Sequence, residues 1–191
     1  MVNPFFQLLT LFFVIFDPLA SFVIFTVATS SMHQKERQRT ATIAVLVAAT
    51  ISFLVLLFGQ SLLQLFNMNI REFQVAGGIV LAILGLKMVL GYSLIEVDRV
   101  KGDSSWAIAS IIGTPLLTGP AAITSIIISA SSYGKIITGL AVGIVLAVTA
   151  ILFYNTKRVS PILGRTMIQV ISTILGLITL AWGVKYVLQG F

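Results

Sequence analysis

Six long apolar segments, separated by short polar connectors, restrict this chain to very few folds. Since the hydrocarbon core of a bilayer needs about 20 apolar residues per helix, each segment predicts a transmembrane helix. Hydrophobic residues make up 58% of the 191 residues and charged residues only 9%, which excludes a soluble globular domain. We therefore predict an all-α membrane protein, embedded in a lipid bilayer, with helices at about 4–29, 40–66, 71–92, 106–130, 136–154 and 166–189.

The basic residues stand singly or in short groups within the connectors. They do not line one face, so the net charge of +6 predicts no nucleic-acid partner. Cytoplasmic loops of membrane proteins carry an excess of Lys and Arg, so these residues predict orientation. Eight lie on one side of the predicted helices and two on the other: Lys35, Arg37, Arg39, Arg99, Lys101, Lys157, Arg158 and Arg165 against Arg71 and Lys135. We expect both termini outside the cytoplasm.

Two short motifs occur twice, in the same order and at nearly the same separation. Lys185 in GVKYVLQG follows Lys87 in GLKMVLG by 98 residues. Pro120 in TGPAAI follows Pro18 in FDPLAS by 102 residues. Each half of the chain holds three predicted helices, and because three is odd, the second half must enter the membrane from the opposite side. We predict two inverted three-helix repeats, at 1–92 and 106–191, joined by a cytoplasmic connector at 93–105.

A proline interrupts the middle of the first and the fourth apolar segments. Pro18 follows Asp17 in one, and Pro120 follows Gly119 in the other. Since proline removes a backbone donor and strains the preceding turn, helices 1 and 4 should break near the bilayer midplane, where only a polar cavity tolerates free backbone groups. Half-helix N-termini favour anions, whereas freed carbonyls and the Asp17 carboxylate favour cations. The pattern predicts a site for a zwitterion or a coupling ion between these helices.

The candidate substrate-binding residues flank the two breaks: Asp17, Pro18, Ser21, Thr114, Thr118, Gly119 and Pro120. We expect Asp17 to bind a substrate ammonium or to carry a coupling proton. Thr114 and Thr118 would supply hydroxyls, and the backbone at Gly119 would meet the substrate carboxylate. Alternatively, Asp17 only stabilises a kink through hydrogen bonds to Ser21 or to backbone amides. An ionised carboxylate at the membrane centre costs at least about 2.5 kcal/mol on insertion scales, which favours a functional role.

Two further features have structural interpretations. Lys87 and Lys185 lie near predicted helix ends, where a long side chain can carry its ammonium to the interface. Rows of small residues predict close helix packing, at Gly77, Gly78 and Ala82 and at Gly139, Gly143 and Ala147.

Enzymatic and metal chemistry find little support in the sequence. There is no cysteine, and the single histidine, His33, stands in a polar connector without neighbours at ligand spacing. Asp17 is the only midspan carboxylate, so an acid/base or metal cluster at membrane depth has no further members. We expect no enzyme activity, no metal and no cofactor beyond a possible coupling proton or sodium ion. A secondary transporter, a passive channel and a membrane assembly subunit without transport activity remain open.

Four stretches resemble the MarC family of six-span membrane proteins. They are DPLASFVIF at 17–25, FQVAGGIVLAILGLKMVL at 73–90, TPLLTGPAAITSII at 114–127 and ISTILGLITLAWGVKYVLQGF at 171–191. The resemblance implies inverted three-helix repeats, an inner (plasma) membrane location and, for some members, transport of small neutral amino acids. It matches Asp17 and Pro18 to the family's first break, and Thr118, Gly119 and Pro120 to its second.

The chain departs from the family pattern at several positions. The first family motif usually reads DP-x-GN-x-PIF, but Ala20, Ser21 and Val23 stand at its Gly, Asn and Pro positions. Gln74 and Thr173 occupy two positions where the family often has arginine. The absence of both positive charges is consistent with an altered ion or substrate preference.

Overall fold

The computed structural model describes residues 3–91, 108–109, 112–159 and 165–191. Within these ranges the regular elements are all helical. They are α1 (Pro4–Phe16), α2 (Pro18–Ala28), α3 (Gln34–Leu65), α4 (Ile70–Val89), the π-helical segment η2 (Ile112–Leu117), α6 (Pro120–Tyr133), α7 (Lys135–Tyr154), α8 (Thr156–Val159) and α9 (Arg165–Gly190).

Five helical segments among the described residues are long and apolar enough to cross a membrane. They are Pro4–Ala28, which comprises α1 and α2, and the segments Gln34–Leu65, Ile70–Val89, Lys135–Tyr154 and Gln169–Gly190. The chain is therefore an all-helical, multi-pass membrane protein. The remaining expected span, 106–130, includes residues outside the described ranges, and the 14-residue helix α6 begins within it at Pro120 and ends beyond it at Tyr133. A count of six stays a prediction, as does the division of the chain at 93–105, because that connector lies outside the described residues.

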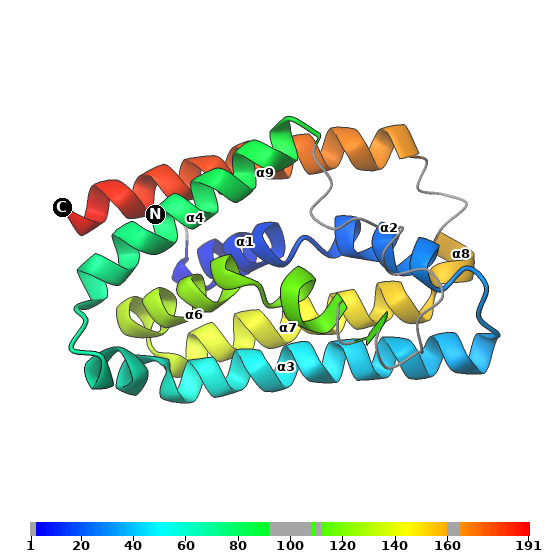
Figure 1. Cartoon of the computed structure of the whole chain (residues 1–191), viewed down its shortest axis with the longest axis horizontal. Helices are drawn as coiled ribbons and strands as arrows, with labels where there is room; N and C mark the ends of the chain where they lie inside the picture. Colours follow the sequence, from blue (N-terminus) through cyan, green and yellow to red (C-terminus); the bar gives the residue numbers. More distant parts are fainter. Residues whose placement is uncertain (1–2, 92–107, 110–111, 160–164) are drawn as a thin grey trace.

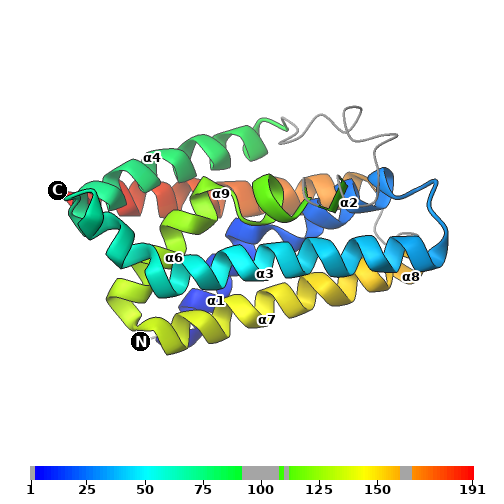
Figure 2. The same cartoon turned by 60° about the horizontal axis from the view of Figure 1, so that its bottom comes forward.

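The helices run along one common axis and surround the first segment (Figures 1 and 2). Helices α4 and α9 pack together along one side of the bundle, and α3 and α7 pack together along the opposite side. In the first segment, α1 and α2 together, 67% of the apolar window is buried, against 28% in α3, in α4 and in α9. The outer helices instead expose large apolar side chains, as lipid-facing helices do. The proline-interrupted segment thus forms the centre of the fold.

Basic residues that flank the helices gather at one end of the bundle. The start of α1 and the end of α9 lie at one end, where α6 also turns into α7 (Figures 1 and 2). The opposite end carries the beginning of α3, with Lys35, Arg37 and Arg39, and the short helix α8, with Lys157 and Arg158. This grouping agrees with the expected arrangement of basic connectors, while the orientation in a membrane stays a prediction.

Close backbone packing joins α4 and α9. A Cβ added at Gly78 would lie 2.7 Å from the carbonyl oxygen of Gly183, and one at Gly85 would lie 2.6 Å from that of Gly176. These distances are shorter than real Cβ contacts, so no side chain fits there without moving a helix. The predicted close packing of the small residues on α4 is confirmed.

The corresponding prediction for α7 is wrong at Gly143. A Cβ there would have its nearest neighbour, a ring atom of Phe53, at 3.9 Å, which is ordinary van der Waals contact. The small residues of α7 instead border an apolar groove of about 500 Å³. At Gly139 an added Cβ would lie 2.9 Å from Cδ2 of Leu56, so the contact of this row with α3 is made to side chains rather than to the α3 backbone.

Candidate functional site

The first helical segment changes direction at Asp17. Helix α1 ends at Phe16 and α2 begins at Pro18, while Asp17 between them has φ 38° and ψ 69°. Proline cannot donate a backbone hydrogen bond and disfavours the α conformation at the residue before it, and aspartate tolerates the left-handed region better than most residues. The local sequence therefore explains why the helix stops here. Asp17 is only 4% exposed, so its carboxylate lies inside the bundle.

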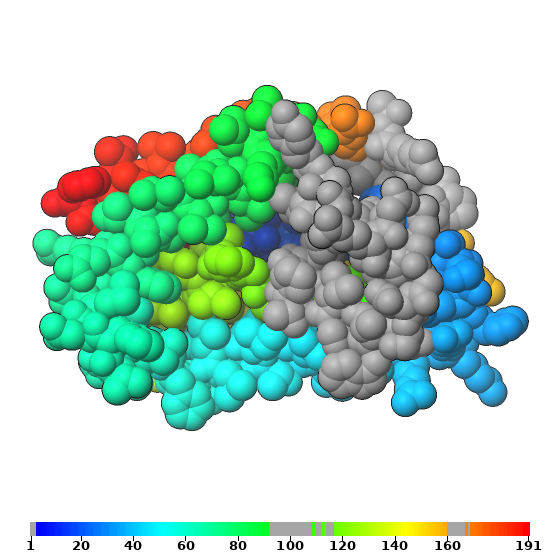
Figure 3. Space-filling view, in the orientation of Figure 1, coloured from blue at the N-terminus to red at the C-terminus, as the bar shows by residue number. Residues whose placement is uncertain are grey.

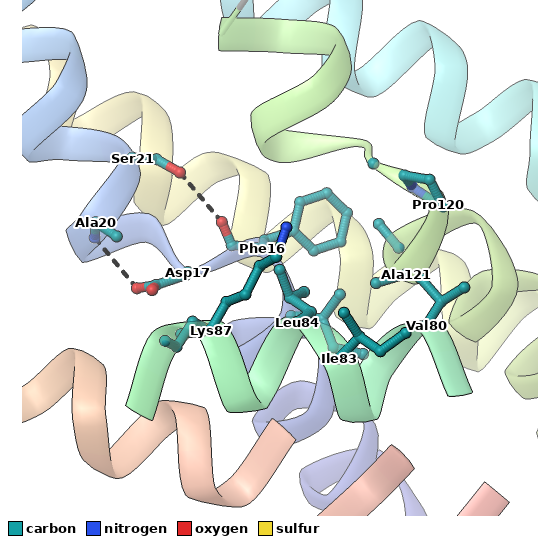
Figure 4. Close-up of a pocket in the computed structure, with 14 residues that line it drawn as sticks. Phe16, Asp17, Ala20, Ser21, Val80, Ile83, Leu84, Lys87, Pro120 and Ala121 are labelled. Atoms are coloured by element: carbon teal, nitrogen blue, oxygen red, sulfur yellow. Dashed lines mark hydrogen bonds between the residues drawn. The ribbon is translucent and has the colours of Figure 1, made fainter. Parts of the chain in front are cut away.

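Side chains at this break satisfy part of the free backbone. The Ala20 N–H donates to Oδ1 of Asp17 at 3.1 Å, so the carboxylate caps α2. The Ser21 hydroxyl donates to the Phe16 carbonyl at the end of α1, at 3.2 Å (Figure 4). The kink-stabilising role left open by the sequence thus accounts for one oxygen of Asp17.

The second oxygen of Asp17 is different. Oδ2 is buried and has no hydrogen-bond partner among the described residues. The Ser172 side chain of α9 lies near the carboxylate, but it does not complete the hydrogen bonding of Oδ2. A buried carboxylate oxygen without a partner is costly, and a bound cation or a donor group would remove that cost.

A similar arrangement precedes α6. The hydroxyl of Thr118 donates to the Gly113 carbonyl at 2.7 Å, and it spans the same five positions as the hydrogen bond from Ser21 to Phe16. Helix α6 then begins at Pro120, with Gly119 as its N-cap residue in an extended conformation. Glycine has no side chain to cap the helix, so the first amide groups of α6 receive no side-chain acceptor from the cap. The two breaks therefore differ: α2 is capped by a carboxylate and α6 is not.

The two breaks line one cavity of about 260 Å³. The first break contributes Asp17 and Ser21, the second contributes Gly119 and Pro120, and α4 closes the cavity with Val80, Ile83, Leu84, Lys87 and Met88. In the space-filling view a hollow opens between α4 and α6, with atoms of α1 at its floor (Figure 3). Four of the seven predicted residues thus come together around one space.

Of the other three predicted residues, the structure describes the side chains of Pro18 and Thr118. Pro18 is buried at the first turn of α2, and the buried Thr118 uses its hydroxyl on the Gly113 carbonyl. Thr114 belongs to η2, and its side chain lies outside the described part of the structure. Neither Pro18 nor Thr118 lines the cavity, and the binding roles given to the seven residues stay predictions.

Sequence reasoning missed Lys87 as a cavity residue. Its side chain extends from α4 into the space between the two breaks, on the side of Phe16 and Pro120 (Figure 4). Lys87 is also exposed, which agrees with its interpretation as an interface residue, so the same side chain both lines the cavity and reaches the surface of the bundle. The repeated GLK and GVK motifs were the available signal. Lys185, the second member of that pair, places its ammonium 4.3 Å from the centre of the Trp182 ring.

Comparison with known proteins identifies the family of this chain. The family model described as MarC family integral membrane protein matches residues 2–191. The chain belongs to the MarC family. This confirms the resemblance, which rested on four stretches spread over the sequence.

Several relatives cover nearly the full length of the chain. A membrane protein from Methanocaldococcus jannaschii, named UPF0056 membrane protein, is 31% identical over 93% of this chain and 91% of its own length. One from Archaeoglobus fulgidus is 30% identical, over 97% and 91%. The YhcE protein of Escherichia coli, also a UPF0056 membrane protein, is 29% identical, over 93% and 87%. These names state no substrate and no enzymatic activity, and no solved structure matches the chain.

Proposed function

We propose that this MarC family protein is a secondary transporter of small neutral amino acids or similar small zwitterions across the inner membrane. The observation that carries the proposal is the cavity between the two breaks, where a buried carboxylate oxygen without a partner shares one space with a helix N-terminus that lacks a side-chain cap. We propose no enzymatic activity and no resident cofactor.

The two ends of the cavity suit the two charges of an amino acid. Oδ2 of Asp17 offers an acceptor for an ammonium group. The N-terminus of α6 carries the positive end of the helix dipole, and the Lys87 ammonium enters the same cavity, so a carboxylate is favoured on that side. At the N-terminus of α2 the protein's own Asp17 carboxylate caps the helix. A substrate carboxylate would take the corresponding place at α6.

The size of the cavity favours a small solute. Its volume of about 260 Å³ is below the range of roughly 300–1,000 Å³ typical of sites for drug-sized ligands. The remaining lining is apolar, from Val80, Ile83 and Leu84, and this suits a short aliphatic side chain.

The contacts between α4 and α9 support inverted repeats. Gly78 contacts Gly183, and Gly85 contacts Gly176. Adding the sequence offset of 98 residues to Gly78 gives Gly176, and subtracting it from Gly183 gives Gly85. The offset therefore converts the contact of Gly78 with Gly183 into the contact of Gly176 with Gly85. A two-fold axis perpendicular to two antiparallel helices relates pairs of contacts in the same way. Inverted repeats around broken helices are the architecture in which many secondary transporters alternate access to a central site.

Coupling follows from the same carboxylate. Because a charged Asp17 without a partner is costly inside the bundle, a proton or a sodium ion would accompany it whenever substrate is absent. The cation and the substrate ammonium would then compete for, or share, one carboxylate. That relation is what ion-coupled transport requires, and we propose Asp17 as the coupling group.

Uptake into proteoliposomes tests the proposal. The purified protein should accumulate a small neutral amino acid above its external concentration when a proton or a sodium gradient is imposed. Small amino acids should also raise the apparent melting temperature in detergent, because they bind the folded state. Movement only down the solute gradient indicates a passive channel. Absence of both uptake and thermal shift over a panel of small amino acids indicates an assembly subunit without transport activity, and would refute the proposal.

A further inference from the structure

A second group of buried polar side chains lies between α6 and α9, away from the central cavity. Ser125 and Ser129 of α6 are 0% and 1% exposed, and Tyr186 of α9 is 4% exposed. The Tyr186 side chain lies near both serines. Neither serine Oγ has a hydrogen-bond partner in the described part of the chain. We refer to these three residues as the seam.

The hydroxyls of the seam differ from most buried hydroxyls of the bundle. Thr149 donates to the Val145 carbonyl and Thr179 to the Leu175 carbonyl, each one turn back on its own helix. Such bonds satisfy a buried hydroxyl at little cost. Ser125 and Ser129 make no bond of this kind, although they stand one turn apart and approach a common tyrosine. If these positions served only helix packing, alanine would be the more stable residue, because it buries no hydroxyl that lacks a hydrogen bond.

The serines continue a row that starts in the central cavity. Ala121 lines the cavity, and Ser125, Ser129 and Tyr133 follow at steps of four residues, so neighbours in the row lie one above the other while the row winds about 40° around α6 at each step. With a rise of about 1.5 Å per residue, the row extends about 18 Å along the helix. It ends where α6 turns into α7, at the end of the bundle that also holds both chain termini (Figures 1 and 2).

Helices α6 and α9 make few contacts with each other, so they can separate at the seam. Helix α9 packs mainly on α4, and it reaches the serines of α6 through the Tyr186 side chain. Glycine flanks α6 on both sides: Gly119 precedes it, and Gly134 follows with a φ of 86° and no atom within 4 Å of an added Cβ. Helix α6 can therefore tilt at the Gly134 turn without breaking a tight contact there, and its closest packing, of Thr124 on Gly77 and of Ile127 on Gly59, lies further along the helix.

We propose that the seam is the closed half of the solute path, a second and transient binding position between the central cavity and the terminal end of the bundle. This inference rests on the proposed transport function. Tyr186 closes the path in this structure. When α6 tilts away from α9, the hydroxyls of Ser125 and Ser129 bind the polar groups of a small zwitterion on its way between the cavity and the water at that end.

The absence of cysteine from the chain makes a direct test possible. Ser125→Cys and Ser129→Cys are introduced singly, with Tyr186 intact and with Tyr186→Ala. Spheroplasts and inside-out vesicles are treated with a membrane-impermeant cationic methanethiosulfonate. Ser132→Cys, at an exposed position of the same helix end, serves as the reactive control. Thr149→Cys, fully buried on α7, serves as the unreactive control.

We expect the cysteines at positions 125 and 129 to react with the thiol reagent only from the side of the membrane that holds both chain termini. Ser125→Cys and Ser129→Cys should react at least tenfold faster with Tyr186→Ala than with Tyr186, and Thr149→Cys should remain unreactive in both. Tyr186→Leu keeps apolar bulk and serves in place of Tyr186→Ala if that variant fails to fold; a smaller acceleration is expected. The proposal is overturned if both serine positions stay as unreactive as Thr149→Cys in all backgrounds while Ser132→Cys reacts, or if they react from the opposite side.

Transport measured on the same preparations separates the two proposals. If Ser125→Cys and Ser129→Cys accumulate substrate and yet never react from the terminal side, the path lies elsewhere and the transport function stands. If the parent protein transports no solute while the serine positions open after Tyr186→Ala, the seam is a polar path and the transport function is wrong.

Discussion

Replacing Asp17 by asparagine separates the structural role of this residue from its charge. The Asp17 side chain caps α2 through Oδ1, and its Oδ2 has no partner among the described residues. Asparagine caps helices about as well as aspartate, whereas alanine at a cap costs about 0.5–2 kcal/mol. We therefore expect Asp17→Asn to melt within a few degrees of the parent in detergent, and Asp17→Ala to melt distinctly lower.

The charge of Asp17 should matter mainly for binding. A hydrogen bond to a charged group contributes about 1.5–3 kcal/mol, and about 1.4 kcal/mol corresponds to a factor of ten in affinity. Loss of the ionic contact between Oδ2 and a substrate ammonium should weaken binding about 10- to 150-fold. Asp17→Asn should also lose the dependence of uptake on the imposed cation gradient, since a neutral amide takes up neither a proton nor a sodium ion in exchange.

The assay is uptake of a small neutral amino acid into proteoliposomes, with no gradient, with a proton gradient and with a sodium gradient, for the parent and both variants. Asp17→Ala serves as the matched control, because it removes the cap and the charge together. If Asp17→Asn transports like the parent under every gradient, Asp17 is only a kink residue, and both the binding role and the coupling role given to it are wrong.

Three further predictions follow from the packing and the charges. Gly85→Leu should lower the melting temperature, because even a Cβ there would lie 2.4 Å from the α9 backbone, and overpacking costs about 1–3 kcal/mol or more. The control variant Gly143→Ala should leave the melting temperature unchanged. Lys87→Met should weaken binding of a neutral amino acid about tenfold or more, and should not affect the corresponding amine without a carboxylate, as measured by thermal shift. Single cysteines at Ser132 and Gln38 should react with an impermeant thiol reagent from opposite sides, Ser132 from outside the cytoplasm; labelling of both from one side contradicts the predicted topology.

Local chemistry made the helix ends at the two prolines predictable from the sequence, while breaks near the bilayer midplane stay a prediction. The Asp17–Pro18 pair sets the end of α1, because the proline acts on the residue directly before it. The same reasoning located the start of α6 at Pro120. Hydropathy likewise predicted the long apolar helices, since the length of a membrane span depends on composition and hardly on its neighbours.

Side-chain directions could not be predicted in the same way. Lys87 enters the cavity because the glycine contacts with α9 set the rotation of α4, and those contacts are tertiary. Thr118 was expected to face the substrate, but its hydroxyl bonds to the Gly113 carbonyl within its own break. Ser125 and Ser129 carried no signal, because isolated serines in an apolar run also occur where a helix simply packs against another.

Under the proposed transport function, unequal residues at the two breaks would let one small cavity distinguish the two ends of a zwitterion. The contacts of α4 and α9 exchange under one sequence offset, and both breaks use a hydroxyl to satisfy a carbonyl five residues earlier. The residue before each proline differs, with aspartate at one break and glycine at the other. Aspartate supplies a negative charge and occupies its own helix N-terminus, while glycine leaves the other N-terminus without a side-chain cap. Under the proposed function, the polarity of the cavity therefore depends on Asp17 and Gly119, each the residue before its proline, together with the cation of Lys87.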